Sequence, residues 1–240
     1  MERFRIDTIV ATPNPQQVIW AAMHQDYSEG YVVDEADMWP DEEKAGDLII
    51  KYLLAGNRGH YGPLEHPQIT LNVGFFPHSM MQQLRTHRVG ISFDVQSFRY
   101  TGWRMIDVAK NVKNVEEVFY LRPVGQYDNR QGKKYQYTAE QRAEDLQWCL
   151  EACKRYQQRI EEGLSEEHAR GLIPFDARQN FVVSCNTRSL MHLLDLRWKK
   201  DAQLEAQKFC ELLYVRFEEW CPAVAHWYEE NRAKKARLSP

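Results

Sequence analysis

"RTHRVGISFDVQSFRYTGWR", residues 85–104, interleaves positive charge with apolar side chains. It contains a single acid, Asp94, and five basic residues, which are Arg85, His87, Arg88, Arg99 and Arg104. Apolar residues recur between these charges, which is unlike a simple solvated face. Because a guanidinium beside apolar side chains needs an anionic partner to offset its desolvation, the stretch predicts a place where an anion is held.

The composition of the whole chain limits which class of anion this stretch binds. Its 240 residues are 27% charged and 43% hydrophobic, which is ordinary for a globular protein. The formal net charge of −3 argues against a general polyanion binder, so the basic character of residues 85–104 is local. The length and composition predict a single domain over residues 1–240.

Cysteine use and hydropathy predict the compartment. The five cysteines are odd in number and form no Cys-x-x-Cys motif, which is typical of a reducing environment. Cys149 and Cys153, four positions apart on a predicted helix, are expected to pack in the core. No apolar run approaches the roughly eighteen residues of a membrane span, and the first residues, MERFRIDTIV, are too charged for a signal peptide. We therefore expect a cytoplasmic protein that does not span a membrane.

Local patterns predict strands early in the chain and helices late. Alternating apolar residues indicate strands over residues 4–13 and 68–76. A glycine-rich loop is expected over 56–66 and a polar loop over 121–137. Helices are predicted over 13–28, 41–56, 77–88, from the Thr138–Gln141 capping box to about Glu162, after Ser165, and over 187–200, 201–219 and 222–232. This order favours the α+β class over alternating βαβ units.

The helix predicted over residues 77–88 carries charge beside an apolar stripe. At about 100° per residue, Arg88 falls in the stripe and His87 at its edge. An arginine that extends past the core is the plainer alternative. We favour a bound ligand, because several basic residues converge here.

The helix over residues 186–200 shows two polar groups. Arg197 falls in its apolar stripe, whereas Arg188, His192 and Asp195 share the opposite face. We expect two separate functions, one on each side of the helix. A solvated face with contacts three and four residues apart is the alternative for the second group. A buried structural ion pair is the alternative for Arg197.

Short motifs argue against several other chemistries. The loop at 56–66 lacks the G-x-G-x-x-G pattern, no G-x-x-x-x-G-K-[ST] occurs, and the eight histidines include no H-E-x-x-H. We therefore expect no Rossmann site, no P-loop and no metal centre. Ser97 has no base placed beside it by spacing, so a hydrogen bond to a phosphate oxygen is preferred to a nucleophilic role.

Four ordered segments resemble the signature of the flavin-dependent thymidylate synthases. QQLRTHRVGISFDVQSFRY, residues 82–100, is similar to the family's R-H-R motif followed by S-x-R. The other three are GHYGPLEH (59–66), ARGLIP (169–174) and NTRSLMHLLDLR (186–197), which resemble the family's G-H-x-x-P-x-E-H, A-R-x-x-L-P and N-x-R-S-L segments. The resemblance covers roughly residues 56–200.

The chain departs from the family pattern at a few positions. Either Arg85 or Thr86 stands for the first arginine of R-H-R, before His87 and Arg88. Eight residues, one more than in the family, separate Arg88 from Ser97. Val95 occupies the position where the family usually has an acid, and Gln82 and Gln83 are alternatives for one glutamine.

The resemblance implies a fold, a reaction and a set of site residues. It implies an α+β homotetramer with active sites shared between subunits, which converts dUMP to dTMP. Methylenetetrahydrofolate would give the one-carbon unit, reduced FAD the hydride, and NADPH would reduce FAD again. The implied FAD contacts are His60, Gly62, Arg85 or Thr86, His87, Arg88, Asn186, Arg188 and His192. The implied dUMP contacts are Gln82 or Gln83, Arg85, Val95, Gln96, Ser97, Arg99, Arg170 and Arg197, of which Arg197 has the catalytic role.

Two other functions remain as alternatives. A module that binds single-stranded nucleic acid would use the arginines together with the aromatic residues of this stretch, Phe93, Phe98, Tyr100 and Trp103. The negative net charge and the helical last third weigh against it, so no nucleic-acid partner is expected. A different flavoenzyme on the same scaffold is the other alternative.

Overall fold

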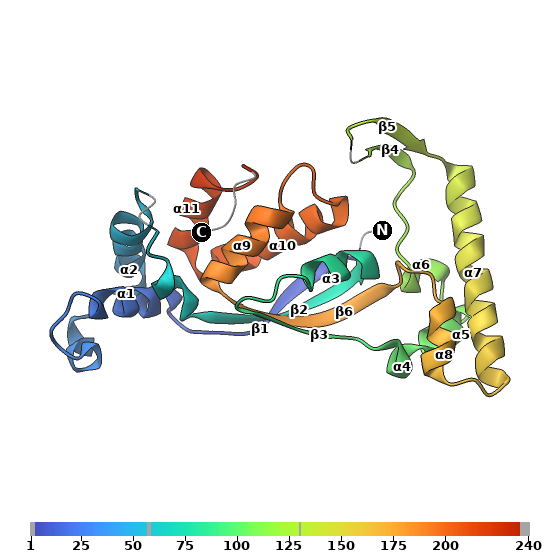
Figure 1. The fold of residues 1–240 in the computed structure, drawn as a ribbon, viewed down its shortest axis with the longest axis horizontal. Helices are drawn as coiled ribbons and strands as arrows, with labels where there is room; N and C mark the ends of the chain where they lie inside the picture. Colours follow the sequence, from blue (N-terminus) through green and yellow to red (C-terminus); the bar gives the residue numbers. More distant parts are fainter. Residues whose placement is uncertain (1–2, 57–58, 130, 236–240) are drawn as a thin grey trace. The chain divides into compact units, whose positions relative to one another are not determined.

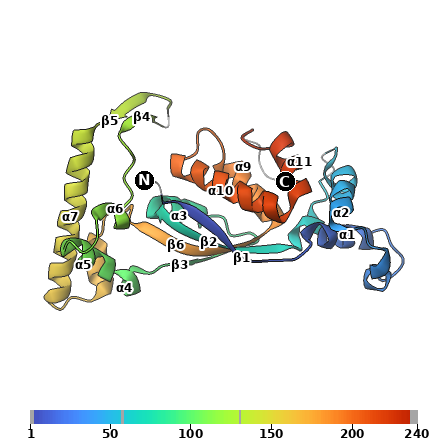
Figure 2. The same cartoon turned by 180° about the vertical axis from the view of Figure 1, so that it is seen from behind.

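The computed structural model describes residues 3–56, 59–129 and 131–235. It combines a four-stranded sheet with helices, which confirms the predicted α+β class (Figures 1 and 2). The chain forms two compact units. Unit 1 comprises Met1–Arg3, Gly74–Gln83 and Val95–Phe181, and unit 2 comprises Phe4–Val73, Leu84–Asp94 and Val182–Pro240.

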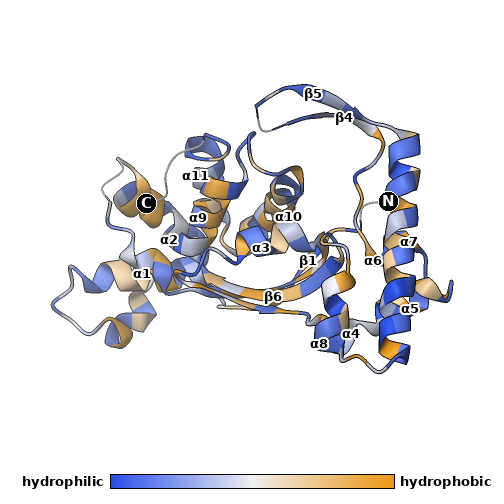
Figure 3. Ribbon diagram, turned by 45° about the vertical axis from the view of Figure 1, so that its right-hand side comes forward, coloured by the Kyte–Doolittle hydropathy of each residue, from blue (hydrophilic) through white to orange (hydrophobic). Residues whose placement is uncertain are grey.

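The four-stranded sheet has the order β1-β2-β6-β3. Its strands are β1 (Arg5–Ala11), β2 (Gln68–Pro77), β6 (Arg178–Asn186) and β3 (Ile91–Val95). Strand β6, which lies inside the sheet, was not predicted from the sequence. Phe181, Val183 and Cys185 alternate along β6 as buried side chains, and Figure 3 shows the middle of this strand as hydrophobic.

Helices complete unit 2. The last third of the chain is helical as predicted, with α9 (Thr187–Arg197), α10 (Leu204–Trp220) and α11 (Pro222–Asn231). Helix α10 packs on β1, and α9 and α11 pack on α10 (Figure 1). The N-terminal part adds α1 (Pro15–Gln25), η1 (Val32–Met38), α2 (Glu42–Ile49), the π-helical turn η2 (Ile50–Leu54) and η3 (Gly62–Glu65).

Unit 1 is mainly helical. It contains most of α3 (His78–Leu84), then α4 (Phe98–Thr101), α5 (Trp103–Ala109), α6 (Val115–Val118), α7 (Ala139–Glu161), α8 (Glu166–Ala169) and η4 (Arg170–Leu172). The predicted capping box is present, because the side chains and backbones of Thr138 and Gln141 exchange hydrogen bonds at the start of α7. The prediction of a loop over 121–137 was wrong, since β4 (Gly125–Asp128) pairs with β5 (Lys134–Tyr137) as a hairpin.

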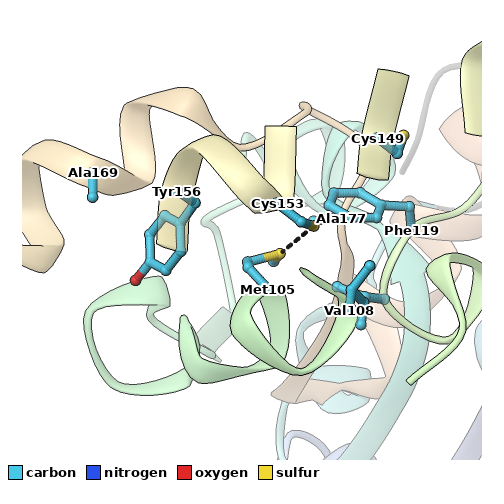
Figure 4. Close-up of a cluster of buried hydrophobic side chains, with 9 residues drawn as sticks. Met105, Val108, Phe119, Cys149, Cys153, Tyr156, Ala169 and Ala177 are labelled. Atoms are coloured by element: carbon cyan, nitrogen blue, oxygen red, sulfur yellow. Dashed lines mark hydrogen bonds between the residues drawn. The ribbon is translucent and has the colours of Figure 1, made fainter. Parts of the chain in front are cut away.

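The core of unit 1 forms where α5 packs on α7 (Figure 4). Cys153 and Met105 bring their sulfur atoms to 4.0 Å, and Tyr156 is buried one turn further along α7. Figure 3 shows α7 as largely hydrophilic outside this contact face. All five cysteines are buried free thiols, which confirms the expected core positions of Cys149 and Cys153. No helix in the described part of the chain is long and apolar enough to cross a membrane.

Candidate functional site

The start of α9 is fastened to the turn that follows α3. Asn186 ends β6 and caps α9, because its Oδ1 accepts a hydrogen bond from Ser189 N at 2.8 Å. The hydroxyl of Ser189 donates to the carbonyl of Val89 at 2.9 Å. Gly90 then packs so closely that a Cβ atom would lie 2.2 Å from Ser189 Oγ, and its φ of 66° also favours glycine. These contacts place residues 85–90 beside α9.

His87 lies between the two polar groups of α9. Arg197 Nε donates a hydrogen bond to His87 Nε2 at 3.0 Å. The rings of His87 and His192 meet edge to face, with centroids 5.5 Å apart and an interplanar angle of 81°. His87 therefore connects the two polar groups of α9, because this one side chain contacts a residue from each face.

The contact with Arg197 requires a neutral His87. A guanidinium only donates hydrogen bonds, so His87 Nε2 must accept and the ring proton must lie on Nδ1. Burial, and next the charge of Arg197, lower the pKa of His87 to about 4. Burial also lowers the pKa of His192, whose buried Nδ1 has no hydrogen-bond partner among the described residues. His87 and His192 are therefore both uncharged at neutral pH.

Asp195 has a structural partner instead of a solvated position. Its Oδ2 accepts a hydrogen bond from Arg232 Nη2 at 2.7 Å, and its Oδ1 accepts one from the Tyr228 hydroxyl at 3.2 Å. The side chains of Asp195 and Arg232 are only 1% and 8% exposed. Burial raises the pKa of Asp195, although both hydrogen bonds act against that change. The alternative of a solvated face is therefore wrong for this residue.

The glycine-rich segment forms two side-chain pairs, one of which lies at the start of α9. Arg188 forms an ion pair with Glu65, the acid of the GHYGPLEH segment. His60 Nε2 lies 2.8 Å from Asp26 Oδ2 at an exposed position. No atom of residues 3–56, 59–129 and 131–235 would crowd a side chain at Gly62, so these residues leave open space there. Residues 57–58 of the predicted loop lie outside the described residues.

The residues of the R-H-R segment differ from the helical prediction. Helix α3 ends at Leu84, and the amide of His87 donates to the carbonyl of Leu84 in the turn that follows. The predicted position of Arg88 in an apolar stripe was therefore wrong, because Arg88 is exposed beyond the helix. Arg85 and Thr86 are also exposed. Neither Arg85 nor Arg88 forms an ion pair within residues 3–56, 59–129 and 131–235, so both charges face solvent.

Most of the predicted dUMP contacts fall in unit 1. Gln82 is exposed, and its Nε2 lies 2.8 Å from His78 Nε2, one turn earlier on α3. Gln83 is half-buried. Arg85 and Arg197 belong to unit 2, as do all the predicted FAD contacts.

The segment Val95–Ser97 is held mainly by structural hydrogen bonds. Gln96 and Asn180 bond twice, because Gln96 N donates to Asn180 O and Gln96 Oε1 accepts from Asn180 N, each at 3.1 Å. Ser97 caps α4 by accepting from Arg99 N at 3.3 Å. Val95, the half-buried last residue of β3, precedes this pair. The sequence did not indicate these structural roles for Gln96 and Ser97.

Two arginines of unit 1 are exposed and available to an anion. Arg99 Nε forms an ion pair with Glu167 Oε1 at 3.0 Å, and both side chains are about half exposed. Arg170 is exposed directly after α8, the helix that carries Glu167. An incoming phosphate would therefore compete with Glu167 for Arg99.

Four side chains in these contacts were missed in the sequence: Glu65, His78, Glu167 and Arg232. Glu65 lies inside a recognised segment, and Glu167 lies three residues before Arg170. His78 lies four residues before Gln82, the spacing at which helical side chains meet. Nothing in the sequence pairs Arg232 with Asp195, which lies 37 residues earlier.

Comparison with known proteins decides the family. The family model described as "Thymidylate synthase complementing protein" matches residues 8–223. The chain belongs to this family. The flavin-dependent thymidylate synthase of Halobacterium salinarum is 32% identical over 98% of this chain and 100% of that protein. The enzyme of the same name from Haloarcula marismortui is 34% identical over 98% of this chain and 99% of that protein.

A solved structure shows the same fold as this member of the thymidylate synthase complementing protein family. The UMP/dUMP methylase PolB from Streptomyces cacaoi, bound with 5-Br dUMP, matches with a TM-score of 0.77. The match is 21% identical and covers 100% of this chain and 98% of that chain. The family match favours the enzyme over the nucleic-acid module considered from the sequence.

Proposed function

We propose that the protein catalyses the FAD-dependent reductive methylation of dUMP to dTMP, with methylenetetrahydrofolate as one-carbon donor and NADPH as reductant. The full-length relatives named flavin-dependent thymidylate synthase support this proposal. The contact of neutral His87 with both Arg197 and His192 carries it, because residues assigned to the nucleotide and to the flavin meet there.

The residues of unit 2 fit a flavin dinucleotide. Arg85 and Arg88 are exposed without an ion pair in the described chain, which suits a diphosphate. The buried Nδ1 of His192 needs a hydrogen-bond partner that the described residues do not supply. We propose that FAD is held by His60, Gly62, Arg85 or Thr86, His87, Arg88, Asn186, Arg188 and His192. Bound FAD would supply the hydride for the reaction.

The residues of unit 1 fit a nucleotide monophosphate. Arg99 and Arg170 provide exposed guanidinium groups for its phosphate, and the hydroxyl of Ser97 provides a further hydrogen bond. Gln82 or Gln83 would meet the pyrimidine edge. Because the Gln96 side chain is engaged with Asn180, we propose that Val95 and Gln96 contribute through their backbone.

Arg197 would supply the electrostatic part of catalysis. Its guanidinium is half-buried, where burial lowers its pKa and a fixed charge acts more strongly than in water. Placed at the uracil ring, it stabilises the negative charge that develops as C5 becomes nucleophilic.

We further propose a homotetramer whose active sites are shared between subunits, which the sequence resemblance to the family implies. Mixing an inactive Arg99→Ala variant with an inactive Arg197→Ala variant would then restore activity. A mixture that stays inactive, although subunits exchange, would contradict shared sites.

The remaining expectations concern organisation and compartment. The family match over residues 8–223 supports a single family domain across residues 1–240. Five free thiols support a reducing, cytoplasmic compartment.

Titration of the purified protein with FAD tests the cofactor. Binding is expected to quench flavin fluorescence, and NADPH is expected to bleach the flavin absorbance under anaerobic conditions. Addition of methylenetetrahydrofolate and dUMP should then give dTMP. Absence of flavin binding would contradict the proposal.

A further inference from the structure

We propose that His87 is a positioning residue for Arg197, whose guanidinium it orients through its Nε2 lone pair. This inference rests on the proposed function, in which Arg197 meets the pyrimidine. It gives His87 a role toward the nucleotide that is separate from its proposed contact with FAD.

The geometry of the bond sets the direction of the guanidinium. Arg197 Nε donates to His87 Nε2 at 3.0 Å, which is an ordinary hydrogen-bond length. The guanidinium is planar, so a bond in that plane at Nε fixes the directions in which the two Nη groups lie. A flexible arginine side chain thereby acquires one preferred orientation.

His87 is itself held in place by its surroundings. Its ring meets the ring of His192 edge to face at 5.5 Å, and its backbone amide donates to Leu84 O at 3.0 Å. The next turn is fixed by the close packing of Gly90 on Ser189. The acceptor that faces Arg197 is therefore carried by a constrained residue, as a positioning role requires.

The bond also sets the tautomer of His87. Nε2 can accept only when the imidazole is neutral and its proton lies on Nδ1. A protonated ring would place a second cation beside Arg197. The neutral ring orients Arg197 without adding a negative charge beside it, whereas a carboxylate at the same place would offset the charge of the guanidinium.

Two replacements of His87 separate the acceptor from the imidazole. His87→Gln retains an oxygen acceptor at similar reach, and His87→Leu removes it at similar size. Both variants lack the imidazole ring, so FAD affinity and melting temperature should be lowered by the same amount in both. With saturating FAD, kcat for dTMP formation should be about tenfold or more lower in the Leu variant than in the Gln variant. Equal kcat values in the two variants would overturn the proposal.

A double-mutant cycle provides the control. In an Arg197→Lys background, which keeps a positive charge for residual turnover but lacks the planar guanidinium, the acceptor has no planar group to orient, so His87→Gln and His87→Leu should give the same kcat. A Leu variant that is still slower than the Gln variant in that background would also overturn the positioning role.

Nitrogen-15 NMR of the imidazole keeps this inference separate from the reaction. The wild-type protein should show His87 with its proton on Nδ1, and Arg197→Ala should alter the Nε2 signal. A proton on Nε2 in the wild type would overturn the inference whether or not the protein forms dTMP. If His87 has its proton on Nδ1 but no dTMP forms, the proposed function is wrong. The His87–Arg197 hydrogen bond is then a structural contact, and His87 has no positioning role in catalysis.

Discussion

Replacement of Arg232 by methionine would leave Asp195 as an unpaired carboxylate inside unit 2. The pair is almost completely buried, with side-chain exposures of 1% for Asp195 and 8% for Arg232. Removing one partner of such a pair typically costs about 3–5 kcal/mol, because the remaining charge is buried without compensation. Tyr228 still donates to Asp195, and burial already raises the pKa of Asp195, so protonation relieves part of the cost. We therefore expect about 3 kcal/mol.

Urea unfolding at neutral pH measures this cost, with flavin content as a second readout because α9 carries Arg188 and His192. Adding Asp195→Asn to Arg232→Met removes the buried charge and should recover much of the lost stability. Lys44→Met is the matched control, since Lys44 and Asp47 form an exposed pair at 3.9 Å and little change is expected. A free energy of unfolding for Arg232→Met within about 1 kcal/mol of the wild-type value would contradict the expected cost of the unpaired carboxylate.

Three further predictions concern the turn beside α9. Gly90→Ala should lower the melting temperature and the FAD affinity together, because its methyl group would meet Ser189 Oγ at 2.2 Å at a φ of 66°; an unchanged melting temperature would contradict this. The free energy of unfolding should fall as pH drops from 6.5 to about 4, because the pKa of His87 is lowered to about 4 in the folded state and the unfolded chain takes up the proton first. Urea unfolding over this pH range should show a steeper loss for the wild type than for His87→Gln, and equal slopes would argue against it. Fluorescence titration of Arg85→Ala and Thr86→Ala should show weaker FAD binding in only one of them, which identifies the residue that stands for the first arginine of the motif. FAD affinities equal to that of the wild type in both variants would exclude both residues.

Much of the fold follows from local signals. The capping box at Thr138 and the acidic start of α2 predicted their helices, because these devices act within one turn. Strand β6 begins with Arg178, Gln179 and Asn180, and these three polar residues are not typical of a buried strand. Some of these side chains form hydrogen bonds with groups that are distant in the sequence. Arg178 Nη1, for example, donates to Phe75 O at 2.9 Å, and the local sequence cannot show such a contact.

The candidate site was predictable in its residues more than in its contacts. Ordered motifs located Arg197 and His87, but an angle on a helical wheel could not show that a turn from elsewhere in the chain carries His87 to Arg197. The turn itself depends on the end of α3 at Leu84, four residues earlier than expected. The solvated position considered for Asp195 was wrong for the same reason, because its partner Arg232 lies at the end of another helix.

The proposed reaction is tested most directly by mass spectrometry of the nucleotide after incubation of the protein with dUMP, methylenetetrahydrofolate, NADPH and FAD. We expect dTMP in the complete mixture, and none when FAD or methylenetetrahydrofolate is omitted or when Arg197 is replaced by alanine. Unchanged dUMP in the complete mixture, with FAD bound to a folded protein, would contradict it.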